Sequence, residues 1–353
     1  MKQKLLFFSP YFHPYTSGLT VYPYRYFSEL HPDQEVTVLT FAHERKLLKE
    51  EIIGNIKIVR MPYLFRISKG FIAPQSLLYF LRYLRNHDKV IINLPSVEGL
   101  PLTILAKLMG KKVTAFFYCN VDLGDSLSQI ILSKIAYLAV FVQLWLADSI
   151  IALPGYIEST DFGKQFKNKI VTPPPPAKKL PVNKKSLQKY LSEKKSTRWI
   201  GFVGRIAQEK GLEYLIGACQ ILKKEYPLSL RLAGPVDSVG EDKYRTKILA
   251  LLKKSNLDYK IYGFLDEADL GAFYQSLDVL VLPSINSTEA YGMVQMEAML
   301  LGTPVVASNL PGVAMPIQET GMGLLVKSKD VESLANAIDK VIAQRSTFNW
   351  KQA

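Results

Sequence analysis

The pattern of apolar and polar positions predicts a chain in which short buried strands alternate with helices. Short apolar runs recur, and most are followed by a loop containing glycine or proline and then by apolar residues at helical spacing. This order is typical of βαβ units in a parallel sheet, whose strands are covered on both faces. The predicted strands are 5–8, 35–40, 56–60, 90–94, 113–117, 150–153, 199–203, 228–233, 260–262, 279–282, 305–307 and 322–326.

The stretch 283–308 carries the clearest functional pattern. It begins with a loop that contains Glu289, continues into a helix predicted at about 293–301 with Glu297 on it, and ends in the turn Gly302-Thr303-Pro304. The helix N-terminus should face the carboxyl ends of the strands, where oriented N–H groups suit an anionic ligand. Carboxylates accept strong hydrogen bonds from hydroxyl groups. A ligand with both phosphates and hydroxyls, such as a nucleotide sugar, therefore fits these residues.

A second loop, from Gly204 to Gly211, joins the strand 199–203 to a helix that extends through Leu222. It contains Arg205, a fork-shaped donor, and Lys210, a compact positive charge, and this pair is suited to holding a diphosphate. The alternative interpretation is two solvated surface cations. The Gly-x-Gly-x-x-Gly fingerprint of nicotinamide enzymes is absent here, which disfavours a dehydrogenase.

Length and composition indicate two globular domains. A chain of 353 residues exceeds one ordinary domain, and its 48% hydrophobic content can fill two cores. The proline run 173–176 favours a stiff extended linker, which divides the chain into domains 1–176 and 177–353. Cys119 and Cys219 give no disulfide framework, so we expect a reducing compartment. The first apolar run is short and ends at Pro10, which is typical of a strand rather than a signal peptide.

The positive charge lies mostly in the first half of the chain. Residues 1–180 carry 22 Lys and Arg against 13 Asp and Glu, whereas the remainder carries 22 against 18. This bias suits an anionic membrane surface, nucleic acid or phosphorylated substrates, although no nucleic-acid-binding motif accompanies it. A surface charged only for solubility is the alternative.

Two apolar segments of the first domain bear on membrane contact. The segment 61–85 mixes Phe65, Phe71 and Phe80 with Arg and Lys, and its predicted loop 61–74 leads into a helix. That helix is either a basic membrane-contact surface or an ordinary core-facing helix. The run 130–147 is long enough to span a membrane, but Lys134 and Gln143 and the surrounding βα pattern favour a core helix with an apolar outer face.

These motifs resemble those of a known family. The stretch 283–308, with two Glu separated by seven residues and then Gly-Thr-Pro-Val, is similar to the donor-binding signature of the retaining glycosyltransferase family 4, of the glycosyl transferases group 1. The Gly204–Gly211 loop resembles the family's Gly-Arg…Glu-Lys-Gly motif. The resemblance is strong over about 199–350 and looser over 1–180. It implies an α/β chain of the GT-B fold, with two Rossmann-like domains facing across a cleft.

The resemblance also implies a function. The expected reaction transfers a sugar, with retention, from a nucleotide-diphosphate sugar to an acceptor hydroxyl, which could belong to a lipid-linked or cell-envelope glycan. Domain 1–176 would bind the acceptor and domain 177–353 the donor. Arg205 and Lys210 would hold the diphosphate, Glu289 the donor sugar and Glu297 the ribose, with no metal or other cofactor. The remaining implied donor-binding residues are Gly18, Gly204, Phe264, Leu265, Ala290, Tyr291, Gly292 and Met293.

The chain departs from the family pattern on the acceptor side. Tyr118 or Cys119 stands where the family commonly has a His, and Asn120 stands where an acid is common. We expect Asn120 and Asp122 to contact the acceptor sugar. The missing His favours the alternative of a nucleotide-sugar-binding protein without transferase activity. We further expect a cytoplasmic protein, peripheral at the inner face of the cell membrane, whose terminal crossover helix near 348–350 is short or truncated.

Overall fold

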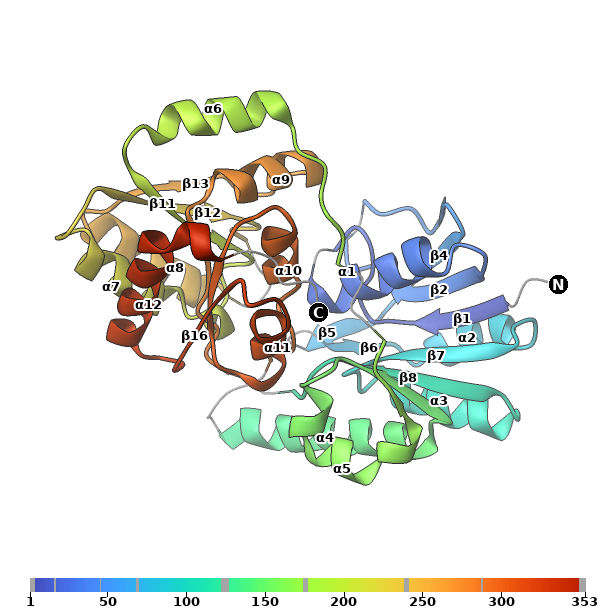
Figure 1. The fold of residues 1–353 in the computed structure, drawn as a ribbon. Coiled ribbons are helices and arrows are strands. Elements are labelled where there is room, and N and C mark those ends of the chain that lie inside the picture. Colours follow the sequence, from blue (N-terminus) through green and yellow to red (C-terminus); the bar gives the residue numbers. More distant parts are fainter. Residues whose placement is uncertain are drawn as a thin grey trace. The chain divides into compact units, whose positions relative to one another are not determined.

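The computed structural model describes residues 4–348 apart from 16, 45, 68–69, 122–126, 174–176, 238–240 and 287. The chain divides into two compact units, Met1–Pro176 (unit 1) and Ala177–Ala353 (unit 2). Each unit is built around its own mainly parallel sheet with helices packed against it (Figure 1).

The sheet of unit 1 has eight strands in the order β10-β9-β8-β7-β1-β2-β4-β3. Every neighbouring pair is parallel except β3 and β4. The strand order reverses beside β1, which pairs with β2 on one side and with β7 on the other. The strands are β1 (Lys4–Phe8), β2 (Glu35–Phe41), β3 (Glu50–Ile53), β4 (Ile56–Met61), β7 (Lys89–Leu94), β8 (Lys112–Phe117), β9 (Ser149–Ala152) and β10 (Ile170–Val171).

The helices of unit 1 follow the strands in alternation. Helices α3 and α4 pack against each other and against β8, and α5 lies beside α4 (Figure 1). The helices are α1 (Gly18–Arg25), α2 (Ser76–Leu84), α3 (Gly99–Leu108), α4 (Leu127–Leu146) and α5 (Asp161–Gln165), with a π-helical turn at Tyr26–Leu30 and 3-10 turns at Ile157–Ser159 and Lys167–Lys169.

Three details of unit 1 differ from the sequence-based expectation. The predicted loop 61–74 contains an antiparallel hairpin of β5 (Phe65–Ile67) and β6 (Gly70–Ile72). Phe71 and Phe80, expected among the membrane-facing residues, lie in the core instead. The first helix begins at Gly18, whereas the apolar pattern of the sequence predicts a helix over 21–30. The earlier start is explained by a capping box, in which Thr20 Oγ1 accepts a hydrogen bond from the Ser17 N–H at 3.0 Å.

Unit 2 has a six-stranded parallel sheet in the order β13-β12-β11-β14-β15-β16. Alternate residues of β11 face opposite cores: Ile200 and Phe202 pack with α7, α8 and α12, whereas Trp199 and Val203 pack with α6, α9, α10 and α11. The strands are β11 (Arg198–Val203), β12 (Leu228–Ala233), β13 (Asp258–Ile261), β14 (Val279–Leu282), β15 (Val305–Ser308) and β16 (Gly323–Val326). The strand expected at 260–262 thus begins two residues earlier, at Asp258.

The helices of unit 2 include three that the sequence pattern does not predict, α6, α8 and α11. The helices are α6 (Lys184–Lys194), α7 (Leu212–Leu222), α8 (Asp242–Lys254), α9 (Glu267–Ser276), α10 (Met293–Leu300), α11 (Pro311–Thr320) and α12 (Val331–Ala343), with 3-10 turns at Gln208–Lys210 and Arg345–Thr347. The expected terminal helix is not observed at Phe348, and Asn349 and Trp350 lie outside the described residues.

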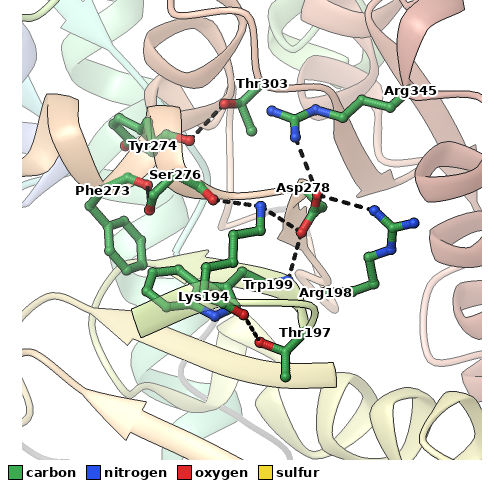
Figure 2. Close-up of polar contacts among 10 residues, drawn as sticks. All are labelled: Lys194, Thr197, Arg198, Trp199, Phe273, Tyr274, Ser276, Asp278, Thr303 and Arg345. Carbon is green, nitrogen blue, oxygen red and sulfur yellow. Dashed lines mark hydrogen bonds and ion pairs between the residues drawn. The ribbon is translucent and has the colours of Figure 1, made fainter. Parts of the chain in front are cut away.

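A buried carboxylate, Asp278, joins several of these elements at the amino end of β14 (Figure 2). Its Oδ2 accepts a hydrogen bond from the Trp199 N–H and also lies 2.7 Å from Lys194 Nζ. Its Oδ1 lies 3.2 Å from Arg345 Nη1. A third cation, Arg198, lies 3.9 Å away. The side chain of Asp278 is only 4% exposed, so burial of this charge is compensated by its partners. We call these residues the Asp278 cluster.

Candidate functional site

The two loops with candidate site residues lie at the point where the strand order of unit 2 reverses. Strand β11 pairs with β12 on one side and β14 on the other. The loop after β11 holds Arg205 and Lys210, and the loop after β14 holds Glu289. In open parallel sheets, ligands bind outside the carboxyl ends of the strands at such a switch point. The topology therefore places both predicted motifs at the expected ligand position of unit 2.

Gly211 allows the two loops to touch. Its φ is +62°, and an added Cβ would lie 2.4 Å from the Pro283 carbonyl oxygen and 2.6 Å from Ile285 Cγ2. A side chain here would meet both strain and a backbone clash. The Ile285 N–H also donates a hydrogen bond to the Glu209 carbonyl at 2.9 Å. The main chain thus fixes one motif against the other.

A side-chain ion pair joins the same two loops. Lys210 Nζ donates to Glu289 Oε2, and these side chains are only 16% and 12% exposed. Ser284 Oγ donates to the same carboxylate oxygen at 3.3 Å, and the Ser284 carbonyl accepts from Ser328 Oγ at 3.0 Å. The structure therefore brings together Lys210 and Glu289, which are 79 residues apart in the sequence.

The second candidate cation has a partner within its own loop. Arg205 Nη2 donates to Glu209 Oε1 at 2.9 Å, and both side chains are largely buried, at 21% and 18% exposed. Since Glu209 also anchors Ile285 through its carbonyl, the orientation of Arg205 depends on the contact between the loops. Glu209 and Ser284 belong to the two motif stretches, but no role was expected for either from the sequence.

Helix α10 separates the two glutamates as predicted, with Glu289 before the helix and Glu297 on it. The helix begins after Gly292, whose φ is +74° and where an added Cβ would lie 2.4 Å from Leu282 Cδ2. Glu297 is 5% exposed, and its Oε2 accepts a hydrogen bond from the Tyr274 hydroxyl at 3.0 Å. Its carboxylate is thereby held in one orientation.

The remaining donor-side candidates follow the carboxyl ends of three strands in unit 2. Gly204 comes directly after β11, and its N–H donates to the Ala233 carbonyl at 2.9 Å. Phe264 and Leu265 follow β13, and the Phe264 side chain is 67% exposed whereas Leu265 is half-buried. Ala290 and Tyr291 are buried and Met293 is half-buried at the start of α10. All of them lie at the same edge of the sheet.

Gly18 and the acceptor-side candidates belong to unit 1. Gly18 begins α1 after β1, where Asn93 Nδ2 donates to Ser9 Oγ at 2.9 Å and to the Leu19 carbonyl at 3.0 Å. Asn120 follows β8, and its N–H donates to the Tyr156 hydroxyl at 2.8 Å. Complete burial raises the pKa of the neighbouring Tyr118 well above its ordinary value, so this phenol stays protonated. Asp122 lies outside the described residues.

The fold of the chain is that of the GT-B glycosyltransferases. The structure of sucrose-phosphate synthase from Thermosynechococcus elongatus matches with a TM-score of 0.79, at 20% identity, over 99% of this chain and 92% of that chain. Anabaena HepE, solved in complex with UDP-glucose, matches with a TM-score of 0.72, at 19% identity, over 98% of this chain and 92% of its own.

The sequence comparison finds the same family as the motifs. Residues 183–351, which make up most of unit 2, match the family model described as glycosyl transferases group 1. A D-inositol 3-phosphate glycosyltransferase from Corynebacterium urealyticum is 33% identical over 152 residues, which are 42% of this chain and 35% of that relative. The chain spans about a third to a half of the length of the curated relatives it matches, with coverages of 36%, 35% and 54%. The resemblance seen in the motifs is confirmed at the level of the group 1 family.

Proposed function

We propose that this protein is a glycosyltransferase that moves a hexosyl or related group from a nucleotide-diphosphate sugar to an acceptor hydroxyl, with retention of anomeric configuration. The observation that carries the proposal is the contact between the two motif loops of unit 2, in which Lys210 pairs with Glu289. The pair supports the proposal because an ammonium group is a suitable partner for a diphosphate and a carboxylate is a suitable acceptor for sugar hydroxyls, and a nucleotide sugar carries both kinds of group.

The donor would bind along the carboxyl edge of the unit 2 sheet. Arg205 and Lys210 would hold the diphosphate, and Gly204 would let the backbone approach it. Glu289 would accept hydrogen bonds from the sugar hydroxyls, with Ser284 and Lys210 fixing its position. Glu297 would hold the ribose, and Phe264 and Leu265 after β13 would contact the base. Ala290, Tyr291, Gly292 and Met293 would line the site at the start of α10.

The transfer step follows from these roles. The acceptor oxygen attacks the anomeric carbon on the side of the leaving group, and the bond from that carbon to the β-phosphate oxygen breaks. The acceptor proton passes to the departing phosphate oxygen, and a nucleoside diphosphate leaves. Arg205 and Lys210 stabilise the negative charge that develops on this leaving group, a form of electrostatic transition-state stabilisation. We propose that the two cations perform this task without a metal ion.

On the acceptor side, we propose that unit 1 binds a glycan or a lipid-linked acceptor of the cell envelope, with Gly18, Asn120 and Asp122 near the reacting groups. We place the protein in the cytoplasm, at the inner face of the cell membrane. Cys119 and Cys219 are both buried and form no disulfide, which is compatible with a reducing compartment.

A thermal-shift screen of nucleotide sugars would identify the donor, because a ligand that binds only the folded state raises the melting temperature. The selected donor is then incubated with candidate acceptors, and release of nucleoside diphosphate is measured together with product formation. We expect turnover that depends on the acceptor. Stabilisation by a nucleotide sugar with neither transfer nor hydrolysis would instead support the alternative of a non-catalytic binding protein, which the absence of a His near Tyr118 favours.

A further inference from the structure

We propose that the outer face of α4 in unit 1 inserts into the interfacial layer of an anionic membrane, with the helix lying along the membrane surface. The proposal deepens the proposed function by naming the surface through which the enzyme would reach a lipid-linked acceptor. It rests on that function only for the nature of the acceptor, since membrane binding itself can be measured without any transfer reaction.

The outer face of α4 is apolar where an ordinary surface helix is polar. Leu127, Ile131, Leu138 and Trp145 are 75%, 51%, 62% and 62% exposed. Their spacing of four or seven residues places them along one line of the helix. The only charged residue on this line is Lys134, whose long side chain can carry its ammonium group to the lipid headgroups while its methylene stem stays among the apolar residues.

The opposite side of α4 is fixed inside unit 1. Gln143 is 1% exposed, and its Nε2 donates to the Ser96 carbonyl at 2.8 Å. The Tyr137 ring stacks on Phe162 of α5 at a centroid distance of 4.7 Å. The segment Gln129–Leu146 is long and apolar enough to cross a membrane, but only 28% of it is buried inside the protein. A helix held on one side by a globular unit can offer lipid only its other side, so the geometry fits an interfacial helix rather than a spanning one.

The distribution of charge favours an anionic membrane as the binding partner of the outer face of α4. Residues 127–147 contain one Lys and no Asp or Glu, and unit 1 as a whole has 20 Lys and Arg against 13 Asp and Glu. Lys164 and Lys167 are exposed beside α4, on α5 and the following 3-10 turn, and the acidic Glu158 and Asp161 are exposed at the preceding turn and the start of α5. Basic residues around an apolar helix are attracted to anionic lipid headgroups, and Trp145 is of the type enriched at membrane interfaces.

A second copy of the chain fits the face less well. In a two-fold symmetric contact the same face packs on itself, so the two copies of Lys134 would approach each other within an apolar contact. No acidic residue between 127 and 147 could pair with them. Burying unpaired ammonium groups is unfavourable, whereas at a lipid interface they remain hydrated.

The hairpin β5–β6 provides a matched control within the same unit. Leu64 and Phe65 are 65% and 53% exposed, close to the values for the α4 residues. Each strand of this hairpin has three residues, so it has no long face to immerse. We therefore compare two double variants. One carries Ile131→Asp and Leu138→Asp in α4, and the other carries Leu64→Asp and Phe65→Asp in the hairpin. Both change the net charge of the protein by the same amount. A difference between them therefore reports on insertion and not on charge.

The test is co-sedimentation of the full chain with phosphatidylcholine vesicles, with and without phosphatidylglycerol. Wild type should bind the anionic vesicles, and the α4 pair should lower the partition coefficient by about tenfold or more, because it removes apolar contact with the lipid. The hairpin pair should lower it much less. Failure of wild type to bind either vesicle, or an equal loss in both pairs, would overturn the proposal.

Further measurements distinguish insertion of the α4 face into lipid from unfolding or dimer formation. The chain contains Trp145, Trp199 and Trp350, so the fluorescence readout uses a Trp350→Phe background. In that background the fluorescence should shift to the blue on anionic vesicles, and Trp145→Phe should remove the shift because Trp199 is fully buried. All substituted positions are exposed, so the melting temperatures should match wild type. Concentration-dependent dimers of wild type that the α4 pair abolishes would contradict the proposal, since a second copy would then cover the face. Donor hydrolysis in water should be unchanged in the α4 pair, which separates this test from that of the transfer activity.

Discussion

The sheet of unit 2 has a cluster of charged side chains at each end, and the two are built differently. At the amino end, Asp278 is 4% exposed and is contacted by the Trp199 N–H, Lys194 and Arg345 (Figure 2). At the carboxyl end, Lys210 and Glu289 lie on loops and are 16% and 12% exposed.

The difference shows how similar residue types acquire different tasks. In the Asp278 cluster, main-chain and side-chain donors surround one carboxylate, and the elements they join are a helix end, two strand ends and the segment after α12. Such an arrangement stabilises the fold. The pair at the carboxyl edge lies where the strand order reverses and is shaped by glycines with positive φ, which is typical of a ligand site. The predictions below exploit this contrast.

The largest effect should follow Asp278→Ala. Lys194 would remain mostly buried without its carboxylate, and removal of one partner from a buried ion pair costs about 3–5 kcal/mol. The midpoint of thermal unfolding of unit 2 should then fall by roughly 10 °C. Asp242→Ala, which removes an exposed partner of Arg245, is the control and should change the midpoint little. Equal midpoints for both variants would contradict a structural role for the cluster.

Arg205→Ala and Lys210→Ala should have the opposite profile. Each should raise the activation free energy of transfer by about 2–4 kcal/mol, because each removes one donor that stabilises the leaving diphosphate. Transfer rates and melting curves of the purified variants check this. Wild-type rates in both folded variants would refute the assignment of these cations.

The two glutamates should separate sugar recognition from nucleotide recognition. Glu297→Gln should weaken binding of free nucleoside diphosphate about tenfold or more, since hydrogen bonds to a charged group contribute roughly 1.5–3 kcal/mol. Glu289→Gln should leave that affinity near wild type and impair binding of the intact nucleotide sugar. Isothermal titration with both ligands tests this. A similar loss of nucleoside diphosphate affinity in both variants would show the roles to be wrong.

Mild acid should destabilise unit 1. Burial lowers the pKa of His43 and of His87, and all four histidines of the chain lie in unit 1. The unfolded chain, with His pKa values near 6.5, then binds more protons than the folded chain. The contribution of these neutral histidines to the folding stability of unit 1 is therefore fully present above about pH 6.5 and decreases as the pH falls below that value.

Denaturant unfolding at several pH values measures this slope, and His43→Gln with His87→Gln should reduce it. A slope unchanged in the double variant would contradict the burial of neutral imidazoles. This is the smallest of the expected effects.

The elements that the sequence predicted best are those whose pattern and packing agree. Strands β12 and β14 have the predicted bounds, because every residue in them is buried. Helix α6 escaped prediction because it is mostly polar and its only buried residue is Tyr190. Helix α11 contains Pro316 in its interior, where proline is typical of a break in a helix, whereas Pro311 occupies the first helical position, which proline favours.

The site could be predicted in its parts but not in its contacts. The motifs predicted Arg205, Lys210 and Glu289, and the topology confirms that their loops are neighbours. The pairing of Lys210 with Glu289 spans 79 residues, and no local pattern contains such a contact. The Asp278 cluster was not predicted for the same reason, since the partners of Asp278 come from three separate elements, α6, β11 and the 3-10 turn after α12.

The most direct test of the central claim is titration of wild type with UDP, GDP and ADP, repeated with Arg205→Ala and with Arg198→Ala. The two variants remove the same side chain from opposite ends of the unit 2 sheet. We predict that wild type binds at least one of the nucleotides, that Arg205→Ala weakens this binding about tenfold or more, and that Arg198→Ala leaves it unchanged. Binding of none of the three nucleotides, or binding that depends on Arg198 and not on Arg205, would contradict a donor site at the carboxyl edge.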